Sequence, residues 1–189
     1  MKLLNLKSKL RRKLLTLYFT NPNKKYYVNQ LARMITDSAG NVRNELMNMV
    51  QDGLFERESL GNLVFYKLNT NHPLYQELYS IIRKSVGIEG GLKSALQGVH
   101  GIKTAFIFGS FAREGENSFS DIDLFIIGNP DTENLLQAIR SQEKMMMREI
   151  NYHVYSENEW SQKREAKAGF IINIIENPKI SLIGDAICI

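Results

Sequence analysis

Cysteine is almost absent from this chain of 189 residues, which contains Cys188 and no second cysteine. A single thiol cannot form an intrachain disulfide, and such scarcity is typical of the reducing cytoplasm, where we expect this protein. No apolar run approaches the roughly 20 residues that a membrane-spanning helix requires, so we expect no membrane partner. Charged residues interrupt the apolar positions of residues 1–13, and we therefore expect no signal peptide.

Histidine is also scarce. The chain has three, and no group of His and Cys shows the spacing of a zinc site. The remaining composition, 43% hydrophobic and 23% charged, is that of an ordinary globular protein. A chain of this length forms one or two domains and buries enough apolar surface to fold without disulfides or structural metals.

Acidic residues are few in the first half of the sequence, whereas the second half has a small excess of them. Residues 1–84 hold 14 Lys or Arg but only 6 Asp or Glu, whereas residues 85–189 hold 10 and 14. A basic segment attracts the phosphate backbone of nucleic acid, and an acidic site attracts a metal ion. We therefore expect the two halves to bind different partners.

A Gly-Ser pair follows a short apolar run at residues 104–108, which we predict to be a strand. Gly109 and Ser110 end this strand and open a turn at residues 111–113 that is compatible with the start of a helix. Glycine lets the backbone approach a ligand closely, and the amides of such a turn can donate hydrogen bonds to phosphate oxygens together with the Ser110 hydroxyl. The pattern predicts a phosphate-binding turn, with Arg113 as a further phosphate contact.

Two aspartates, Asp121 and Asp123, stand at the start of a second apolar run that extends to Ile127. Residues two apart share one face of a strand, so both carboxylates point the same way while Ile122 and Leu124 point into the core. Neighbouring carboxylates repel each other unless a cation neutralises them, and Mg²⁺ takes one or two carboxylates together with substrate phosphates. We predict that this pair binds Mg²⁺ carrying a nucleoside triphosphate.

These elements, in this order, resemble the signature of the nucleotidyltransferase superfamily, in its small, kanamycin-nucleotidyltransferase-like branch: Gly109-Ser110, an Arg-containing turn, Ser120-Asp121-Ile122-Asp123 and a following apolar strand. The resemblance covers roughly residues 100–155. It implies that the Gly-Ser pair holds the β and γ phosphates and that the paired aspartates bind the metal. It also implies a third carboxylate, on a later strand, that helps to activate the acceptor.

The residue at this third acidic position is left open by the sequence. The next strand-like run, residues 148–155, places Glu149, Asn151 and His153 on one face. Asn151 falls where the family's third aspartate would stand, and an amide can position an acceptor but cannot take its proton. Glu149, two residues away on the same face, is the first alternative and His153 the second.

The basic half contains three expected helices followed by two strands. Apolar residues recur at helical spacing over three segments, about residues 10–19, 27–35 and 41–51. Strand-like runs at residues 54–58 and 63–68 flank Gly61-Asn62, which is a hairpin-turn signal. This order resembles the winged helix-turn-helix, in which the third helix enters the DNA major groove and the hairpin lies beside it.

Applied residue by residue, this second resemblance implies DNA contacts on the third helix and on the hairpin. Asn and Arg side chains can make bidentate hydrogen bonds with base edges. The helix offers Asn41, Arg43, Asn44 and Asn48, and the hairpin offers Arg57, Asn62 and Lys67. Some winged helices dock proteins instead, and many polar helix faces meet only solvent, so both alternatives stay open.

We therefore predict an α+β protein with an N-terminal winged helix-turn-helix and a C-terminal α/β nucleotidyltransferase domain with a mixed sheet. The expected divisions are residues 1–70, a helical connector at 71–98, and residues 99–189. The expected partners are double-stranded DNA, a nucleoside triphosphate and an acceptor held by another protein or protomer, because the chain leaves no room for the separate acceptor domain of larger family members. A palindromic operator would favour a homodimer.

Two functions follow from the resemblances. In the first, the protein binds DNA and transfers a nucleoside monophosphate to a hydroxyl acceptor with Mg²⁺, in an antitoxin-like role toward a partner protein. In the second, it is a transcriptional regulator whose transferase domain is catalytically inactive and senses a nucleotide or mediates assembly. Gly109, Ser110, Asp121 and Asp123 favour the enzyme, whereas Asn151 favours the regulator.

Overall fold

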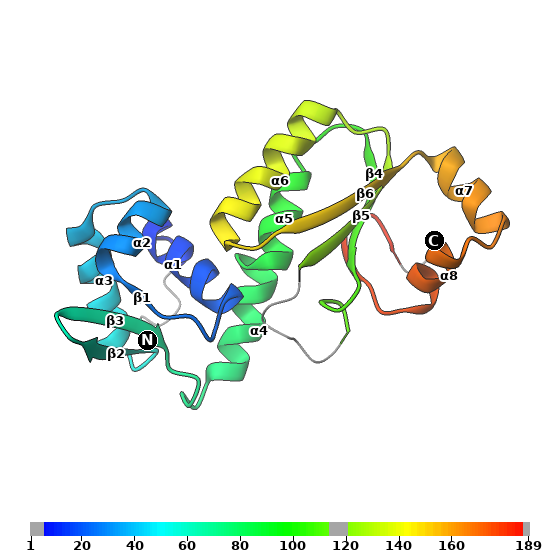
Figure 1. Ribbon diagram of the computed structural model, residues 1–189. Helices are drawn as coiled ribbons and strands as arrows, with labels where there is room; N and C mark the ends of the chain where they lie inside the picture. Colours follow the sequence, from blue (N-terminus) through cyan, green and yellow to red (C-terminus); the bar gives the residue numbers. More distant parts are fainter. Residues whose placement is uncertain (1–5, 114–120, 187–189) are drawn as a thin grey trace. The chain divides into compact units, whose positions relative to one another are not determined.

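The computed structural model of the protein describes residues 6–113 and 121–186 (Figure 1). Ser120 of the acidic motif and Cys188 lie outside these residues. The chain divides into two compact units, Met1–Ile88 and Glu89–Ile189. Among the described helices, none combines the length and the apolar composition needed to cross a membrane.

The first unit contains, in chain order, α1 (Lys9–Thr20), β1 (Tyr26–Tyr27), α2 (Val28–Ile35), α3 (Ala39–Gln51), β2 (Phe55–Leu60), β3 (Leu63–Leu68) and α4 (Tyr75–Ser85). Its sheet has the order β1-β3-β2, with antiparallel pairing throughout. Gly61 lies in the hairpin turn between β2 and β3 with a φ of 58°, a backbone conformation that favours glycine. The three helices and the hairpin expected in this segment are confirmed.

Local sequence determines where α1 and α3 begin. The Ser8 hydroxyl accepts a hydrogen bond from the Arg11 backbone amide at 3.2 Å, and the Ser38 hydroxyl accepts one from the Asn41 amide at 3.1 Å. Each of these serines satisfies an amide that the first helical turn leaves without a partner, which is typically worth about 1 kcal/mol. The start of α3 is therefore fixed independently of any ligand.

Tyr18 of α1 lies at the centre of the core of the first unit. Its fully buried ring meets Tyr26 and Phe55 edge to face, with centroid distances of 5.3 and 4.7 Å. Its hydroxyl donates a hydrogen bond to the Tyr66 carbonyl at 3.0 Å, so the buried polar group has a partner. Burial raises the pKa of Tyr18 far above its ordinary value. This one side chain thus joins α1 to the sheet.

Helix α4 belongs to the first unit. Leu78 and Ile82 are buried in its core, and the Tyr75 ring stacks on Phe19 of α1 with a centroid distance of 6.0 Å. The next helix, α5 (Ile88–Leu96), lies almost entirely in the second unit. The segment 71–98, expected as a connector, is therefore divided between the two units.

The second unit continues with β4 (Ile102–Phe108), β5 (Ile122–Gly128), α6 (Thr132–Met146), β6 (Ile150–Tyr155), α7 (Glu157–Glu165), α8 (Gly169–Glu176) and β7 (Ile180–Ile183). The strand order is β6-β5-β4-β7. Strands β5 and β6 are parallel, whereas β4 is antiparallel to both β5 and β7. The sheet is mixed, as predicted, but β7 was not anticipated from the sequence.

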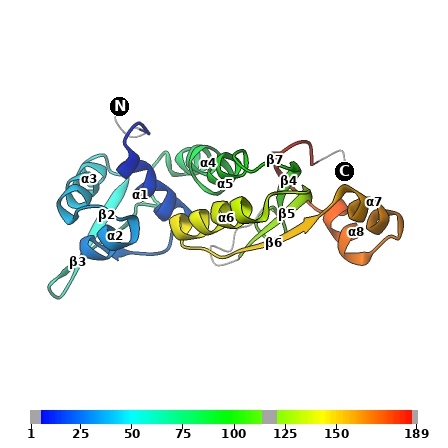
Figure 2. The same ribbon diagram turned by 90° about the horizontal axis from the view of Figure 1, so that it is seen from above.

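Helices cover both faces of this sheet. Figure 2 shows α5 and α6 on one side of the strands and α7 and α8 on the other. On the α7 and α8 side, Phe106 and Phe125 pack in one cluster with Trp160 and Ile171. Strand β5 is buried on both faces because helices cover both sides of the sheet, which explains why its sequence is apolar nearly throughout.

Candidate functional site

Three segments that are distant in sequence meet where β4 ends and β5 begins. Phe108, the last residue of β4, is the antiparallel partner of Asp123. On the other side of β5, the parallel register places Asn151 of β6 beside Asp123 and His153 beside Phe125. The structure thus brings the predicted phosphate turn, the acid pair and the third-acid candidate to one edge of the sheet.

The backbone of Gly109 lies very close to the Asp123 carboxylate. Its φ is 74°, and a Cβ atom added there would lie 2.2 Å from Asp123 Oδ2. A side chain at this position would therefore collide with the carboxylate, in a backbone conformation that L-residues rarely adopt. The turn that follows is anchored by Phe111, which is buried, while Ser110 and Arg113 are exposed. Residues 109–113 form turns rather than a helix in the described part of this segment.

The electrostatics of the acid pair favour a cation. Partial burial raises the pKa of Asp123, and the negative charge of Asp121 raises it further. The Asn151 amide and His153 act in the opposite direction and lower it. The charged form of Asp123 is thus disfavoured overall, and a metal ion would relieve both the desolvation and the repulsion.

A comparison with protein families agrees with this geometry. Residues 91–180 match the family model described as Polymerase beta, Nucleotidyltransferase. The match runs from within α5 to the first residue of β7, and it supports the nucleotidyltransferase resemblance read from the motifs. The second unit thus resembles a nucleotidyltransferase domain over most of its length, and this resemblance implies a nucleoside triphosphate as substrate. A comparison with curated proteins found no match.

Asn151, predicted from the sequence to stand at the third-acid position, is the β6 partner of Asp123. Its side-chain nitrogen donates a hydrogen bond to Asp121 Oδ2 at 3.4 Å, a long contact across β5 and β6. Glu149 precedes β6, and its side chain is exposed, while its carbonyl accepts a hydrogen bond from the Ile122 amide. The site therefore places an amide, and not a carboxylate, next to the two aspartates.

The donors at this edge suit Mg²⁺ bound with a substrate. Within residues 6–113 and 121–186, no three His, Cys, Asp or Glu side chains gather closely enough to hold a metal ion by themselves. Mg²⁺ commonly takes only one or two carboxylates and completes its shell with water and substrate phosphates. Asp121 and Asp123 fit that pattern, and the backbone of Gly109 lies against the Asp123 carboxylate.

Aromatic rings border the acid pair, and reasoning from sequence missed them. Phe170 of α8 lies 5.0 Å from His153 and 6.0 Å from Phe108, measured between ring centroids. Phe170 is 42% exposed, whereas the neighbouring Phe125 is fully buried. The signal in the sequence is the apolar run of residues 170–175, whose composition suits burial in a core and does not indicate a ring beside the site.

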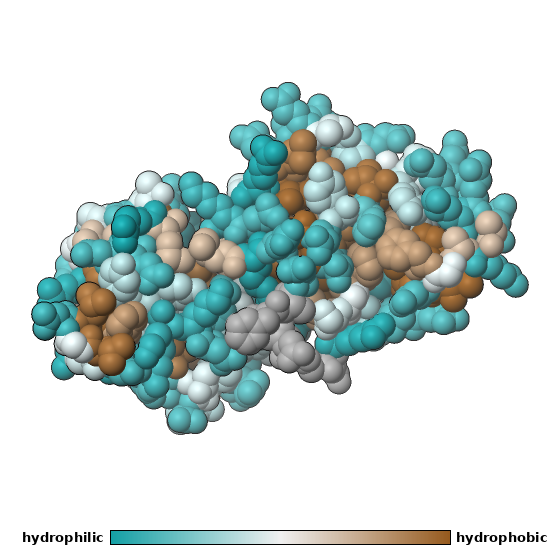
Figure 3. All heavy atoms as spheres, in the orientation of Figure 1, coloured by the Kyte–Doolittle hydropathy of each residue, from teal (hydrophilic) through white to brown (hydrophobic). Residues whose placement is uncertain are grey.

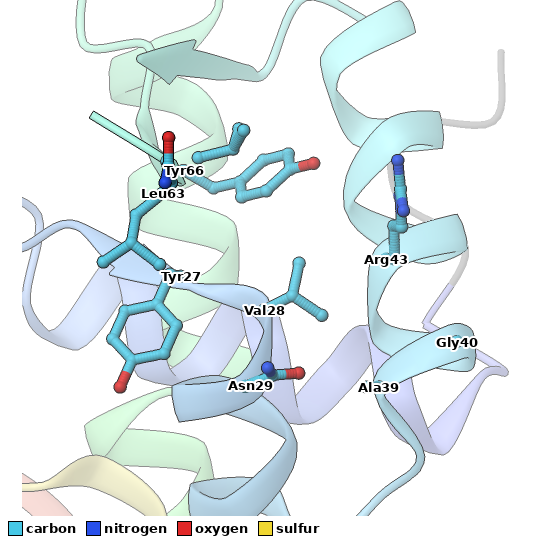
Figure 4. A pocket seen from close by; sticks show the side chains of 10 residues that line it. Tyr27, Val28, Asn29, Ala39, Gly40, Arg43, Leu63 and Tyr66 are labelled. Carbon is cyan, nitrogen blue, oxygen red and sulfur yellow. The ribbon is translucent and has the colours of Figure 1, made fainter. Parts of the chain in front are cut away.

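The polar residues predicted for the third helix lie on one exposed side of α3. Asn41, Arg43, Asn44 and Asn48 are all exposed, although the Asn41 amide donates a hydrogen bond to Asp37 Oδ1 at 3.1 Å. A cleft of about 390 Å³ separates the start of α3 from the hairpin (Figure 4). Figure 4 shows Tyr66 extending from β3 toward α3, and its hydroxyl reaches the sulfur of Met47.

The hairpin offers less free positive charge than its sequence suggests. Lys67 forms an ion pair with Glu56 at 3.2 Å, while Arg57 and Asn62 are exposed. The tip of the hairpin is apolar, because Leu60, Leu63 and Val64 are 61%, 47% and 40% exposed. This tip forms an apolar patch over the β2-β3 hairpin in Figure 3.

Proposed function

We propose that the second unit is a Mg²⁺-dependent nucleotidyltransferase that transfers a nucleoside monophosphate from a triphosphate to a hydroxyl acceptor. The observation that carries the proposal is the packing of the Gly109 backbone against Asp123, beside Asp121, within a segment that matches the nucleotidyltransferase family. A phosphate-binding turn next to two carboxylates is what a triphosphate with a bound cation requires.

Each residue of the edge has a role in this reaction. The amide and hydroxyl of Ser110, with the amide of Gly109, hold the β and γ phosphates, and Arg113 assists them. Asp121 and Asp123 hold Mg²⁺, which supplies charge neutralisation and orientation of the phosphates when it is bound. An acceptor hydroxyl then attacks the α-phosphorus, a new P–O bond forms, and pyrophosphate leaves with the electron pair of the broken bond.

The acceptor side of the site lies along β6. Asn151 orients the acceptor hydroxyl but cannot take its proton, because an amide is not a base at neutral pH. Glu149 and His153, which flank Asn151 in the sequence, are the titratable groups available for that proton. No acceptor-binding domain is required within this chain when a partner protein presents the hydroxyl.

For the first unit we propose a winged helix-turn-helix that binds double-stranded DNA. Its helix order and its hairpin support the proposal, as does the exposed polar side of α3 with Arg43. The excess of basic residues over residues 1–84 would contribute contacts with the phosphate backbone. Recognition of a palindromic operator would favour a homodimer, and DNA binding together with nucleotidylation of a partner protein would give the protein an antitoxin-like role.

A regulator with an inactive transferase domain is the second candidate. The observation that favours it is the amide of Asn151 at the position where a carboxylate is expected. Such a protein would retain the phosphate turn and the acid pair, so it would still bind a nucleotide with Mg²⁺, but it would transfer nothing. Binding and transfer must therefore be measured separately.

The first experiment is calorimetric titration of Mg-ATP, and then of the other triphosphates, into the wild type and an Asp121→Asn/Asp123→Asn double variant. We expect binding that requires Mg²⁺ and is lost in the double variant. A wild type that binds no triphosphate would refute the nucleotidyltransferase proposal. Incubation with α-labelled triphosphate and a cell lysate then distinguishes the enzyme, which labels an acceptor, from the regulator, which does not.

The DNA proposal has its own test. Fluorescence anisotropy of the promoter DNA upstream of the chain's own coding sequence should show saturable binding that weakens steeply with salt. Random DNA of equal length is the control for specificity. Equal affinity for both would contradict operator recognition and indicate non-specific DNA binding, whereas no affinity for either would favour the protein-docking alternative.

A further inference from the structure

Phe170 is an exposed aromatic residue next to a buried part of α8. It is the second residue of α8, and 42% of it faces solvent, although Ile171 beside it is buried in the cluster that covers Phe125. Single exposed apolar residues are common and need no explanation. Phe170 differs because its ring lies in a group of rings next to the two aspartates.

Two further rings complete this group. The His153 ring lies 5.0 Å from that of Phe170, with the planes at 60°, and the side chain of His153 is exposed. The Phe108 ring lies 6.0 Å from Phe170 and 6.2 Å from His153. We call Phe108, His153 and Phe170 the ring cluster. Its members come from β4, β6 and α8, so it is assembled by the tertiary fold.

The strand register places the ring cluster directly beside the acid pair. Phe108 is the partner of Asp123 across β4 and β5. His153 is two residues beyond Asn151, the partner of Asp123 across β5 and β6, and therefore shares its face. A ligand bound to the aspartates would therefore also be able to contact the rings on the same face of the sheet.

The chemistry of these neighbours defines the ligand. A Gly-Ser turn and two carboxylates suit phosphates with a cation, and the exposed rings of His153 and Phe170, backed by the half-buried Phe108, suit a flat, apolar partner. A nucleotide combines both features within one molecule, and every base offers a face for stacking. We propose that the ring cluster is a surface on which a nucleobase stacks, next to the phosphate and metal positions. This inference rests on the function proposed above.

The base has two possible sources at this site. One is the bound nucleoside triphosphate, whose phosphates would occupy the Gly109 turn at the β4 side. The other is an acceptor nucleotide, whose hydroxyl would approach from the β6 side, where Asn151 and His153 lie. The stacking chemistry is the same in both, and the experiment separates them.

The test compares ligands with and without a base on the full chain. Calorimetry would measure the affinity of Mg-ATP, of Mg-tripolyphosphate and of the dinucleotide ApA for the wild type and for Phe170→Ala, Phe170→Leu and Phe170→Tyr. Met145→Ala is the matched control, because Met145 is an exposed apolar residue of the same unit. Thermal unfolding of each variant shows whether it is folded, and Phe170→Leu keeps most of the apolar volume.

Loss of a stacking ring should weaken binding of a base-bearing ligand roughly tenfold, with rescue by Phe170→Tyr. A loss for Mg-ATP with unchanged tripolyphosphate affinity assigns the surface to the triphosphate's base. A loss for ApA alone assigns it to an acceptor base. Equal affinities of wild type and Phe170→Ala for both base-bearing ligands would overturn the inference, as would a failure of both to bind the wild type. Failure of tripolyphosphate alone would instead count against the proposed phosphate site.

Discussion

The side-chain amide of Asn151 in β6 donates a hydrogen bond, at 3.4 Å, to Asp121, which immediately precedes the parallel strand β5. An amide in this place avoids the repulsion that a third carboxylate would add to Asp121 and Asp123. It thereby stabilises the metal-free site, but it removes a negative charge and a base.

Replacement of Asn151 by Asp should make the protein depend more strongly on Mg²⁺. Without the metal, a third carboxylate at this edge should lower the free energy of unfolding by about 1 kcal/mol, since like charges would lie together. With the metal, that loss should be recovered through tighter binding. Thermal unfolding with EDTA and with MgCl₂ measures both effects. Asn151→Ala is the control, and an identical response of the two variants to Mg²⁺ would contradict the prediction.

Asn151→Asp should also raise any transfer activity that the wild type shows. A carboxylate can accept the proton of the acceptor hydroxyl, and general base catalysis typically contributes about 100-fold or more. The measurement is the rate of label incorporation from α-labelled triphosphate into acceptor. Unchanged activity in this variant would indicate that Glu149 or His153 already serves as the base.

The metal-free protein should lose stability as the pH rises through the pKa of Asp123. Burial holds this pKa above its ordinary value of 3.8, and the charge of Asp121 adds to the effect. The folded protein then binds the proton more tightly than the unfolded chain, so the free energy of unfolding falls between pH 3.8 and the folded pKa and levels off above it.

Urea unfolding in EDTA at a series of pH values, for the wild type and for Asp123→Asn, isolates this contribution. The variant lacks the titrating group, so the wild-type stability relative to it should decrease with pH over that window. Asp121→Asn should show a shallower decrease, because it removes the neighbouring charge. A relative stability that increases with pH would mean that Asp123 is stabilised, and not destabilised, in its charged form.

Gly109→Ala should damage both stability and nucleotide binding. The new Cβ would lie 2.2 Å from Asp123 Oδ2 at a φ of 74°, so either the turn or the carboxylate must move. We expect a cost of about 1 to 3 kcal/mol in the free energy of unfolding and loss of Mg-ATP binding. Gly98→Ala is the matched control, because its added Cβ meets only the Ala95 carbonyl at 3.6 Å. Normal nucleotide affinity in Gly109→Ala would remove Gly109 from the site.

Arg43→Ala should weaken DNA binding more than Lys67→Ala. Arg43 is exposed at the start of α3, whereas Lys67 is already paired with Glu56 on the hairpin. An arginine that reads a base typically contributes about 1 to 3 kcal/mol, and a lysine that contacts a phosphate mainly changes the salt dependence. Anisotropy titrations at several salt concentrations measure both, with Lys144→Ala of the second unit as control. Equal losses for all three variants would indicate only a general charge effect.

Sequence patterns were sufficient where the information is local. The alternation around Asp121 and Asp123 predicted their strand and its buried face, and Gly61 with Asn62 predicted the hairpin. The position of Asn151 beside Asp123 was also anticipated, but only through resemblance to a family. Its parallel pairing depends on the crossover through α6, and no local pattern specifies which strands become neighbours.

Other features depend on packing between distant segments. Phe170 belongs to an apolar run, and the sequence could not show that its ring is exposed, because that exposure is decided by how α8 lies over the sheet. Helix α4 was expected to connect two domains, but its apolar residues Leu78 and Ile82 complete the core of the first unit. The ion pair of Lys67 with Glu56 joins opposite strands of the hairpin, so neither residue alone revealed it.

Strand β7 has a practical consequence for anyone who isolates the nucleotidyltransferase domain. The family match stops at residue 180, where β7 begins. Residues Ile180–Ile183 pair with β4, the strand that leads into Gly109, and Leu182 is buried. A fragment that ends at residue 180 would lack β7. Strand β4 would then be the edge strand of the sheet, and its unpaired backbone groups would promote aggregation. Expression of this domain should therefore retain the chain through at least Ala186.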